Sequence, residues 1–489
     1  MILPALVLIP LVGGTLAWLA GRRRPVAARW VALVTVLADL ALALTLFGRV
    51  DAPVRTAPVG GPWIAHAQWD WIPQIGASLQ FGIDGLSLWL VVLTLVLGAL
   101  GVLVSWREIE ERVGLFHFHL TATLAGIVGV FVALDLLLFY VFWELMLIPM
   151  VFLIGLWGHE RRIAAAVKFF LFTQAGGLLL LVAILSLVQA HVATGAARSF
   201  DLFALVGTPM GATEVWIALG FVVAFAVKLP AVPLHTWLPD AHTEAPTAGS
   251  LVLAGLLLKT GAYGMLRFVL PLFPGAVETL APALMTLGVV GILYGAVLAF
   301  GQTDLKRLVA YTSVSHLGFV LLGIFSGDVW GLRGAVLQMI CHGLSTGALF
   351  AVVGQLQERL HTRAIDRVAG LQARAPRLAG WSLLFVMASL GLPGLGNFVA
   401  EFLVLAGSFR SSVVLTAIAV SGLVMATLYS LRVLQRVFHG PESLPAPVAD
   451  LDAREVTVLA VMAVGLVWLG LYPMPVLEGV APFLDGLVR

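Results

Sequence analysis

Four charged side chains lie in the middle of long apolar stretches, where a charge is costly. Glu144 lies in FWELM, Lys228 lies in AFAVKLP, Lys259 follows LLL, and Glu401 follows NFVA. A lysine at the centre of a membrane helix costs about 2.5–3.5 kcal/mol on insertion scales, so such residues face a protein interior and pair or lose their proton. Buried ion pairs with a purely structural role are the alternative, but membrane packing relies mainly on small residues. We therefore interpret the four charges as functional.

Glu144 and Lys228 are natural partners for a proton switch. At a separation of about 8 Å and an effective dielectric constant near 20, a carboxylate stabilises an ammonium group by roughly 2 kcal/mol. Moving or protonating the carboxylate would therefore release the proton of the lysine without a metal or a redox group. His316 and His342 also lie in apolar runs, and histidine suits a proton relay because it titrates near neutral pH. Packing roles or ligation of a haem are the alternatives for these two histidines.

For the other charges in apolar stretches, a structural role is an alternative to a functional one. Lys168 lies one turn inside a predicted helix and could either join a relay or extend its ammonium group to the membrane surface. Asp135 lies between two apolar stretches, where an interfacial position is the alternative. Asp39 is equally consistent with a hydrogen-bonded packing residue. We expect Arg267, which lies near a helix end, only to reach toward the surface.

The composition indicates which elements must hold these residues. Of the 489 residues, 60% are hydrophobic and 11% are charged, and the mean hydropathy is +1.03. Soluble domains have about 45–50% apolar and about 25% charged residues, so the sequence excludes soluble globular and disordered proteins. The single cysteine, Cys341, excludes a disulfide scaffold and an iron–sulfur cluster held by this chain alone. The sequence therefore predicts an all-α polytopic membrane protein.

Motifs for soluble cofactor chemistry are missing from the sequence. It contains no Walker-type phosphate loop and no strand–turn–helix dinucleotide motif. Residues 159–162 read HERR, which begins like a zinc-protease motif but lacks its second histidine, so we expect a charge cluster in a loop there. The net charge of +2 comes with no separate basic patch, which gives no reason to expect nucleic acid as a partner.

Fourteen stretches are long and apolar enough for a membrane helix of about 20 residues. They are residues 2–20, 29–48, 84–105, 114–133, 135–157, 163–191, 213–238, 245–272, 278–300, 306–326, 329–357, 378–408, 411–437 and 455–473. Basic residues concentrate in alternate loops, beginning with Arg22–Arg24, and cytoplasmic loops are the ones enriched in Lys and Arg. We therefore expect both termini on the periplasmic side.

Proline and glycine interrupt two of the spans beside a buried charge. Pro230 and Pro233 follow Lys228 in the seventh span, and residues 391–396 of the twelfth read GLPGLG, ahead of Glu401. Paired interruptions in corresponding segments indicate an inverted-repeat transporter fold. Spans 4–8 and 9–13 each contain five helices, and two consecutive units with an odd number of helices run in opposite directions.

These spans predict four segments. They are N-terminal helices over 1–113, a first five-helix repeat over 114–272, a second over 273–437, and a last helix with its tail over 438–489.

Three long motifs carry a resemblance to a known family. Residues 228–250 read KLPAVPLHTWLPDAHTEAPTAGS, residues 256–264 read LLLKTGAYG, and residues 142–150 read FWELMLIPM. They resemble the antiporter-like membrane subunits of respiratory complex I, the proton-pumping NADH:quinone oxidoreductase, over all fourteen spans. The M-type subunits of this family (chain 4 in mitochondria) are the most similar. The other types usually have Lys where this chain has Glu401, and the L type has a long lateral helix for which residues 474–489 are too short.

The resemblance implies a proton channel driven by redox chemistry in other subunits, with no redox centre in this chain. By motif, it implies proton translocation through Glu144, Lys228, Lys259, His316, His342 and Glu401, with Lys168, His235 and Asp135 as further candidates. It implies no cofactor and no metal in this chain, whereas FMN, iron–sulfur clusters and quinone are expected in partner subunits. The expected partners are the other membrane-arm subunits, especially those of the L and N types, in a bacterial inner membrane.

Two related functions use the same residues and stay open as alternatives. One is a subunit of a multisubunit Na+/H+ antiporter, and the other is a proton-moving subunit of a membrane-bound hydrogenase. A haem quinol oxidase is an alternative of a different class, although one haem would leave the buried lysines unexplained.

Overall fold

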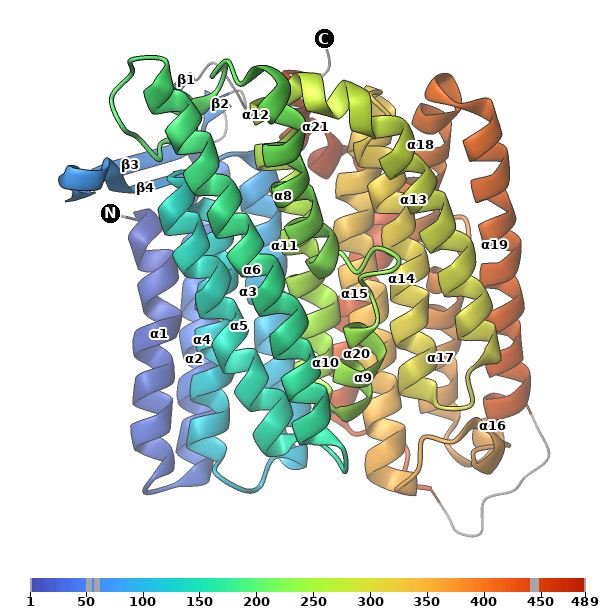
Figure 1. Cartoon of the computed structure of the whole chain (residues 1–489). Helices are drawn as coiled ribbons and strands as arrows, with labels where there is room; N and C mark the ends of the chain where they lie inside the picture. The colour runs from blue at the N-terminus through green and yellow to red at the C-terminus, as the bar shows by residue number, and fades with distance from the viewer. Residues whose placement is uncertain (1, 50–54, 57–61, 440–447, 488–489) are drawn as a thin grey trace.

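The computed structural model describes residues 2–49, 55–56, 62–439 and 448–487. Long helices run side by side between an upper and a lower end, and β3, β4 and α21 lie in the upper part (Figure 1). Among the described residues, thirteen helices are long and apolar enough to cross a membrane. The chain is a multi-pass membrane protein, as the composition predicts.

The first half of the chain contains three N-terminal helices and five further spans. The elements up to the fifth span are α1 (Ile2–Gly21), α2 (Pro25–Leu44), η1 (Phe47–Arg49), β1 (Arg55–Thr56), β2 (Pro62–Trp63), β3 (Ala65–Ile72), η2 (Pro73–Ile75), β4 (Ala77–Ile83), α3 (Gly85–Glu108), α4 (Val113–Val132) and α5 (Leu136–Trp157). The next are α6 (Arg162–Ala193), α7 (Leu202–Leu205), η3 (Gly211–Thr213), α8 (Glu214–Lys228), α9 (Trp237–Glu244), α10 (Thr247–Val252), η4 (Leu253–Leu257), α11 (Leu258–Gly264), η5 (Met265–Val269) and α12 (Leu270–Leu272).

The second half repeats the pattern of long helices with one break. Its elements are α13 (Pro274–Gly301), α14 (Leu305–Ile324), α15 (Val329–Leu360), η6 (Ile365–Arg367), α16 (Leu371–Arg374), α17 (Pro376–Ser389), α18 (Gly396–Ser411), α19 (Val413–Val433), η7 (Leu434–Phe438), α20 (Ala453–Leu471) and α21 (Met474–Leu484).

Aspartate side chains begin five of the long helices. Each accepts a hydrogen bond from a backbone N–H two or three residues further on, which satisfies a donor that the first helical turn leaves free. These N-caps are Asp84 for α3, Asp135 for α5, Asp304 for α14, Asp328 for α15 and Asp452 for α20. Asp135 is thus a capping residue, and one of its oxygens also accepts from the backbone and hydroxyl of Ser78.

Both predicted helix breaks are present, and they shorten the predicted spans. The seventh span ends as a helix at Lys228 rather than at residue 238, and the chain resumes as the short α9 at Trp237. The twelfth consists of α17 and α18, neither of which is long enough to span a membrane alone. In Figure 1, the chain passes downward from α8 to α9 but upward from α17 to α18, as an inverted repeat requires.

The eighth span is continuous but irregular. Two wider, π-helical turns, Leu253–Leu257 and Met265–Val269, flank the α-helical turns that carry Lys259. Wider turns of this kind occur frequently at functional sites because they leave backbone carbonyls without their regular partners.

The connection after the second span adds two short strand pairs to the predicted helical fold. Strands β3 and β4 form an antiparallel hairpin between Ala65 and Ile83, and β1 pairs with β2. No element was predicted from the sequence between residues 48 and 84. Gly76, which closes the hairpin turn, adopts a φ of 76°, a conformation that glycine reaches without a steric penalty.

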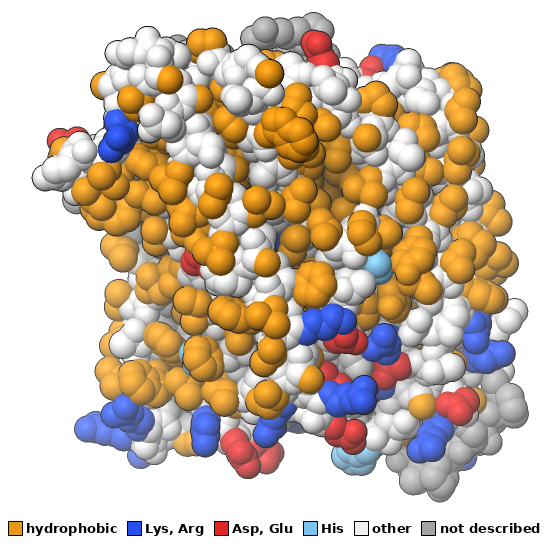
Figure 2. Space-filling view, in the orientation of Figure 1, with side chains coloured by type: hydrophobic (Ala, Val, Ile, Leu, Met, Phe, Trp, Pro, Cys, Tyr) orange, Lys and Arg blue, Asp and Glu red, His pale blue; other side chains and the backbone are white. Residues whose placement is uncertain are grey.

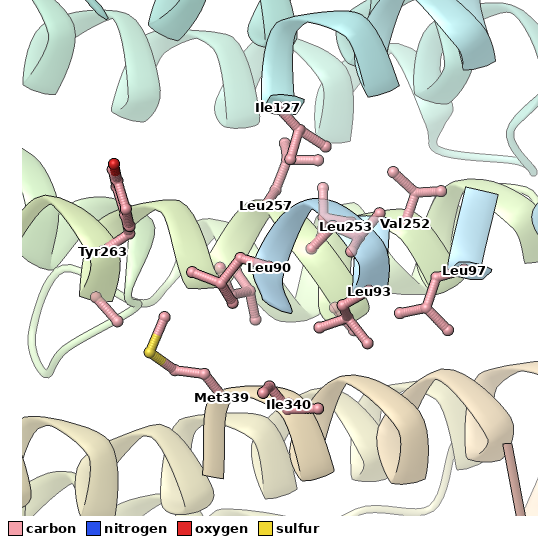
Figure 3. Packing of buried hydrophobic residues seen from close by; sticks show 14 of the residues in the cluster. Leu90, Leu93, Leu97, Ile127, Val252, Leu253, Leu257, Tyr263, Met339 and Ile340 are labelled. Carbon is pink, nitrogen blue, oxygen red and sulfur yellow. The ribbon is translucent and has the colours of Figure 1, made fainter. Parts of the chain in front are cut away.

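Aliphatic packing fixes the eighth span in the middle of the bundle. Leu90, Leu93 and Leu97 of α3 lie between Leu257 and its neighbours on one side and Met339 and Ile340 of α15 on the other (Figure 3). All these side chains are buried, and the whole window of the eighth span is enclosed by protein. Lys259 is therefore surrounded by protein rather than by lipid.

The surface agrees with a lipid environment. Apolar side chains cover most of the visible face, and Lys and Arg side chains gather toward its lower edge (Figure 2). Large aliphatic side chains such as Leu8, Val34, Val182 and Val424 are more than half exposed. In the orientation that the basic loops predict, the lower end faces the cytoplasm and the hairpin end faces the periplasm.

This orientation can be tested with single cysteines at exposed positions of the two ends. We expect a membrane-impermeant maleimide to label Gln74→Cys, between β3 and β4, in intact spheroplasts. It should label Gln372→Cys, in α16, only in inverted vesicles. The native Cys341 is fully buried and should give no background. Labelling of the two positions from the opposite sides would show that the chain is inserted the other way round.

Candidate functional site

Lys259 lies at the centre of the bundle with no exposed surface. Its Nζ atom is 2.5 Å from the carbonyl oxygen of Ala254 and 2.7 Å from Nδ1 of His342. The carbonyl belongs to the wide turn Leu253–Leu257, five residues before the lysine. The irregular turn thus supplies an acceptor that a regular helix would have used within its own ladder.

His342 and His316 continue the polar contacts toward the second half of the chain. The centroids of the two rings, on α15 and α14, are 5.8 Å apart. Nδ1 of His316 is 2.8 Å from Oε1 of Glu401, and Nε2 is 3.1 Å from Oγ of Ser389. Oη of Tyr429 is 3.3 Å from the same Nε2 atom. Both nitrogens of the His316 ring therefore face polar partners in an otherwise apolar interior.

Glu401 ends this series of contacts just beyond the break between α17 and α18. Gln338 donates a hydrogen bond of 2.9 Å to its Oε1, and the side chain is almost completely buried. An open, mostly apolar hollow of about 300 Å³ lies beside it, lined by residues of α18 and α19 together with Leu390 and Gly391.

Lys228 and Glu144 are less tightly held. Lys228 is the last residue of α8 and is 1% exposed, yet its Nζ has no hydrogen-bond partner among the described residues. It lies 5.4 Å from the ring centroid of Trp143 and 5.6 Å from that of Phe169. Oε1 of Glu144 is also without a partner in the described part of the chain, although Tyr140 flanks this carboxylate.

The predicted Glu144–Lys228 pair interacts through space rather than by contact. The two groups are close enough to influence each other electrostatically, but no ion pair within 4.0 Å joins them among the described residues. Glu144 is half-buried on α5, toward the outside of the bundle, whereas Lys228 points inside. Direct proton exchange between them therefore requires water or a movement of one side chain.

The helix break explains the position of Lys228. The indole N–H of Trp237, in α9, donates to the carbonyl of Val227 at 2.9 Å, which satisfies an acceptor that the end of α8 leaves free. The C-terminal end of a helix carries partial negative charge, so it favours a cationic group in its last turn. Pro230 and Pro233 lie between α8 and α9 and keep the helix from continuing.

The three additional candidate residues have different surroundings. Lys168 forms an ion pair of 2.7 Å with Asp240, which also binds Arg307 at 2.9 Å, so its ammonium group does not extend to the surface alone. The ring of His235 lies 5.4 Å from that of Tyr294, with Nδ1 buried and unpartnered in the described structure. Asp135 is engaged as an N-cap, as described above.

The side chain of Arg267 does not reach toward the membrane surface, so the expectation from its position near a helix end was wrong. It is 1% exposed and forms an ion pair of 2.6 Å with Asp84. Asp39, by contrast, is fully buried, and neither carboxylate oxygen has a partner among the described residues. The prospect of a hydrogen-bonded Asp39 is therefore not supported.

Several polar residues of the site give no sequence signal. Gln338, Ser389 and Tyr429 lie in ordinary apolar helices, and only the packing of five separate helices brings them to His316 and Glu401. His242 could have been noticed because it lies in the quoted PDAH motif. It is fully buried, with its ring stacked at 4.4 Å on Phe350.

A second polar group lies at the lower end of the bundle. Lys306, at the start of the predicted span 306–326, is fully buried, with Nζ 2.8 Å from the carbonyl of Ala245 and 3.3 Å from Nε2 of His159. Burial, together with the charges of Lys306 and Arg363, lowers the pKa of His159 to about 3, so its ring is neutral at pH 7. The HERR segment is thus tied into the bundle rather than being only a surface cluster.

The geometry does not favour haem ligation by the two central histidines. Both ring nitrogens of His316 already contact polar side chains, and Nδ1 of His342 contacts Lys259. Within the described ranges, no three His, Cys, Asp or Glu side chains are grouped as metal ligands. What the arrangement can do is hold and pass protons between neighbouring titratable groups.

The chain matches a family of membrane transport subunits. Residues 133–427 match the family model for the NADH:quinone oxidoreductase/Mrp antiporter membrane subunits. The chain therefore belongs to this family, as its motifs predict.

Individual relatives show which type of subunit within the family the chain is similar to. It is 52% identical to NADH-quinone oxidoreductase subunit M of Pseudomonas aeruginosa, over all of this chain and 97% of that protein. A chain of respiratory complex I from Thermus thermophilus has the same fold, with a TM-score of 0.87 and 34% identity, over all of this chain and 99% of that chain. A chain of the Mrp complex from a Dietzia species has a TM-score of 0.84 and 26% identity, over 99% of this chain and 52% of that chain. Within the family, the chain belongs with the M-type subunits.

The close approach of Gly177 to the Glu144 side chain allows a test of whether the position of the carboxylate matters. A Cβ atom at Gly177, on α6, would collide with Oε1 of Glu144. Because that oxygen ends a flexible side chain, we expect Gly177→Ala to displace the carboxylate while the chain still assembles. NADH:quinone turnover should then fall severalfold at unchanged assembly, measured in membranes and on a native gel.

The matched control is Gly155→Ala, on the same helix as Glu144. A Cβ atom there meets only Cβ of Ala166, at an ordinary 3.5 Å. Turnover should stay near that of the wild type. If Gly177→Ala were equally active, the position of the Glu144 carboxylate would not matter for turnover.

Proposed function

We propose that this chain is a proton-translocating subunit of the membrane arm of respiratory complex I. The observation that carries the proposal is the buried series Lys259–His342–His316–Glu401, in which successive groups lie in hydrogen-bond or ring contact. Such a series crosses from the first five-helix repeat into the second, through a region from which lipid is excluded. Titratable groups so arranged inside a membrane protein are suited to proton relay.

Glu144 and Lys228 form the controlling end of the proposed path. The ammonium group of Lys228 has no fixed partner among the described residues, so its proton affinity depends strongly on the charge of Glu144 nearby. Glu144 lies toward the outside of the bundle, where a neighbouring subunit can change its position or protonation. A change there would load or release the proton of Lys228, and the buried series would carry protons onward.

Redox chemistry belongs to other subunits in this proposal. The curated relatives are subunits of NADH-quinone oxidoreductases, and we infer that FMN, the iron–sulfur clusters and quinone are held by partner chains. The present chain would take no part in electron transfer and would be coupled to it mechanically or electrostatically. Its direct partners would be antiporter-like subunits of the L and N types.

The proposed location is a bacterial inner membrane, with both termini on the periplasmic side. The curated relatives come from bacteria, and the basic lower end supports this orientation. The four sequence segments, with a first repeat over 114–272 and a second over 273–437, are consistent with the opposite directions of the two broken helices.

Lys228→Ala in native membranes tests the function. We expect the complex to assemble but NADH:quinone turnover and the proton gradient to fall together by at least about tenfold, as for other residues that transfer a proton. Assembly is checked on a native gel, and Val227→Ala serves as the neighbouring buried control with near-normal turnover. If turnover and the gradient were untouched, the redox-pump assignment would be wrong, and Na+/H+ antiport in the same vesicles would be measured next.

A second variant separates charge from proton release. Lys228→Arg keeps a positive charge, but the guanidinium group does not give up its proton in proteins. We expect this variant to remain defective. Full activity would mean that the charge alone is required and that Lys228 is not a proton carrier.

A further inference from the structure

The eighth span carries a second polar group on the same face as Lys259. Tyr263 follows one turn later and Arg267 two turns later, toward the upper end of the bundle (Figure 1). Neither residue belongs to the series that leads to Glu401. Both are fully or almost fully buried.

Arg267 is held by an ion pair and by hydrogen bonds. Its Nη2 lies 2.6 Å from Oδ2 of Asp84, and its Nε donates to Oη of Tyr263 at 3.2 Å. The other carboxylate oxygen of Asp84 accepts from the backbone N–H of Ser87 at 2.9 Å, so the aspartate is fixed at the start of α3. The two charged side chains are 1–2% exposed.

Aromatic rings enclose the guanidinium group. Its central carbon lies 4.1 Å from the ring centroid of Phe483, 5.0 Å from that of Trp63 and 5.4 Å from that of Tyr263. The rings come from α21, from strand β2 and from the eighth span itself. Parts of the chain that are far apart in the sequence thus exclude water from one arginine.

The hydroxyl groups beside Arg267 do not lead outward. Tyr263 has one hydroxyl proton, which it donates to the carbonyl of Phe131 at 3.0 Å. Oγ of Ser87, 3.2 Å from Oη of Tyr263, is then the donor between these two hydroxyls. A proton that reached Tyr263 would meet a backbone carbonyl, which cannot pass it on. Because Asp84 neutralises Arg267, the obstacle to a further proton is the closed packing of the ion pair and its aromatic rings rather than a net charge.

We propose that the Asp84–Arg267 pair and its aromatic cage form a proton seal between Lys259 and the upper surface. The seal prevents a proton on Lys259 from leaving along its own helix, so that the proton moves laterally to His342. This inference rests on the proposed proton-translocating function. It assigns a positioning role to Arg267. The guanidinium group stays protonated and does not transfer its proton.

The test removes both charges together, because removal of one would leave the other buried without a partner. The purified whole complex carrying D84N/R267M is placed in proteoliposomes, and the amide introduced at position 84 keeps the ability to cap α3. Proton entry driven by a potassium diffusion potential is measured without NADH. We expect the passive leak to rise roughly tenfold or more, because the ion pair that holds the aromatic rings closed over the route is lost.

The same variant is also measured while the complex oxidises NADH. NADH:quinone turnover should stay within about twofold of the wild type, because the series to Glu401 is untouched, while the protons pumped per electron fall. The variant R267K keeps a charge at the seal and should leak much less than the double variant. The control is R359M/E455Q, which removes another buried ion pair, of 2.6 Å, at the lower end and away from Lys259. Its leak should equal that of the wild type.

A structural role alone predicts a different result. If the assembled D84N/R267M complex holds the imposed gradient as well as the wild type, the seal does not exist. If the double variant does not assemble, Phe483→Ala decides, since it opens the cage but keeps the ion pair: a raised leak supports the seal and an unchanged leak overturns it. Failure of the proposed function would instead show in the wild-type complex, as NADH oxidation without a proton gradient.

Discussion

The complete burial of the Lys259 side chain, in a place enclosed by protein, is the constraint on which the rest of the structure depends. An ammonium group can stay there only with acceptors at hydrogen-bond distance, and the carbonyl of Ala254 and the ring of His342 supply them. One acceptor requires the wide turn of the eighth span, and the other requires α15 to pack directly against it. The packing of both α3 and α15 against the eighth span is therefore a condition of the chemistry as well as of stability.

The two helix breaks solve the same problem at other positions. Lys228 ends α8, where the free carbonyls of the last turn favour a cation, and Glu401 lies in the second turn of α18, beside the bend at Gly391. Backbone groups at both breaks find partners within the chain: the N–H of Ala231 donates to the carbonyl of Ala226, and that of Leu395 donates to the carbonyl of Leu392. The indole of Trp237 on the carbonyl of Val227 is one such partner. A charge at a break is thus less costly than a charge in the middle of a regular helix.

The sequence identified the charges buried inside the bundle far better than their surroundings. A lysine or glutamate inside twenty apolar residues has few explanations, so Lys228, Lys259 and Glu401 could be selected without a structure. Arg267 was misjudged because it lies near a helix end, and only the packing of distant segments shows that it is buried. Ser389, Tyr429 and Gln338 could not be found at all, since their polar atoms point to His316 or Glu401 only after five helices have packed. The hairpin β3–β4 lies between two predicted spans, where a search for long apolar stretches detects no short strand.

The tightness of the contacts differs along the proposed path, and this difference indicates where it is controlled. From Lys259 to His342 and from His316 to Glu401, the polar atoms are 2.7–2.8 Å apart, so a proton can move without rearrangement of the backbone. Between Glu144 and Lys228 no such contact exists among the described residues, and the aromatic rings of Trp143 and Phe169 flank the ammonium group. A cation over aromatic faces is held weakly compared with one in an ion pair, so a small movement or a single water changes its proton affinity. Glu144 is also the one member of the proposed path that is only half-buried, so we infer that another subunit exerts control at this junction.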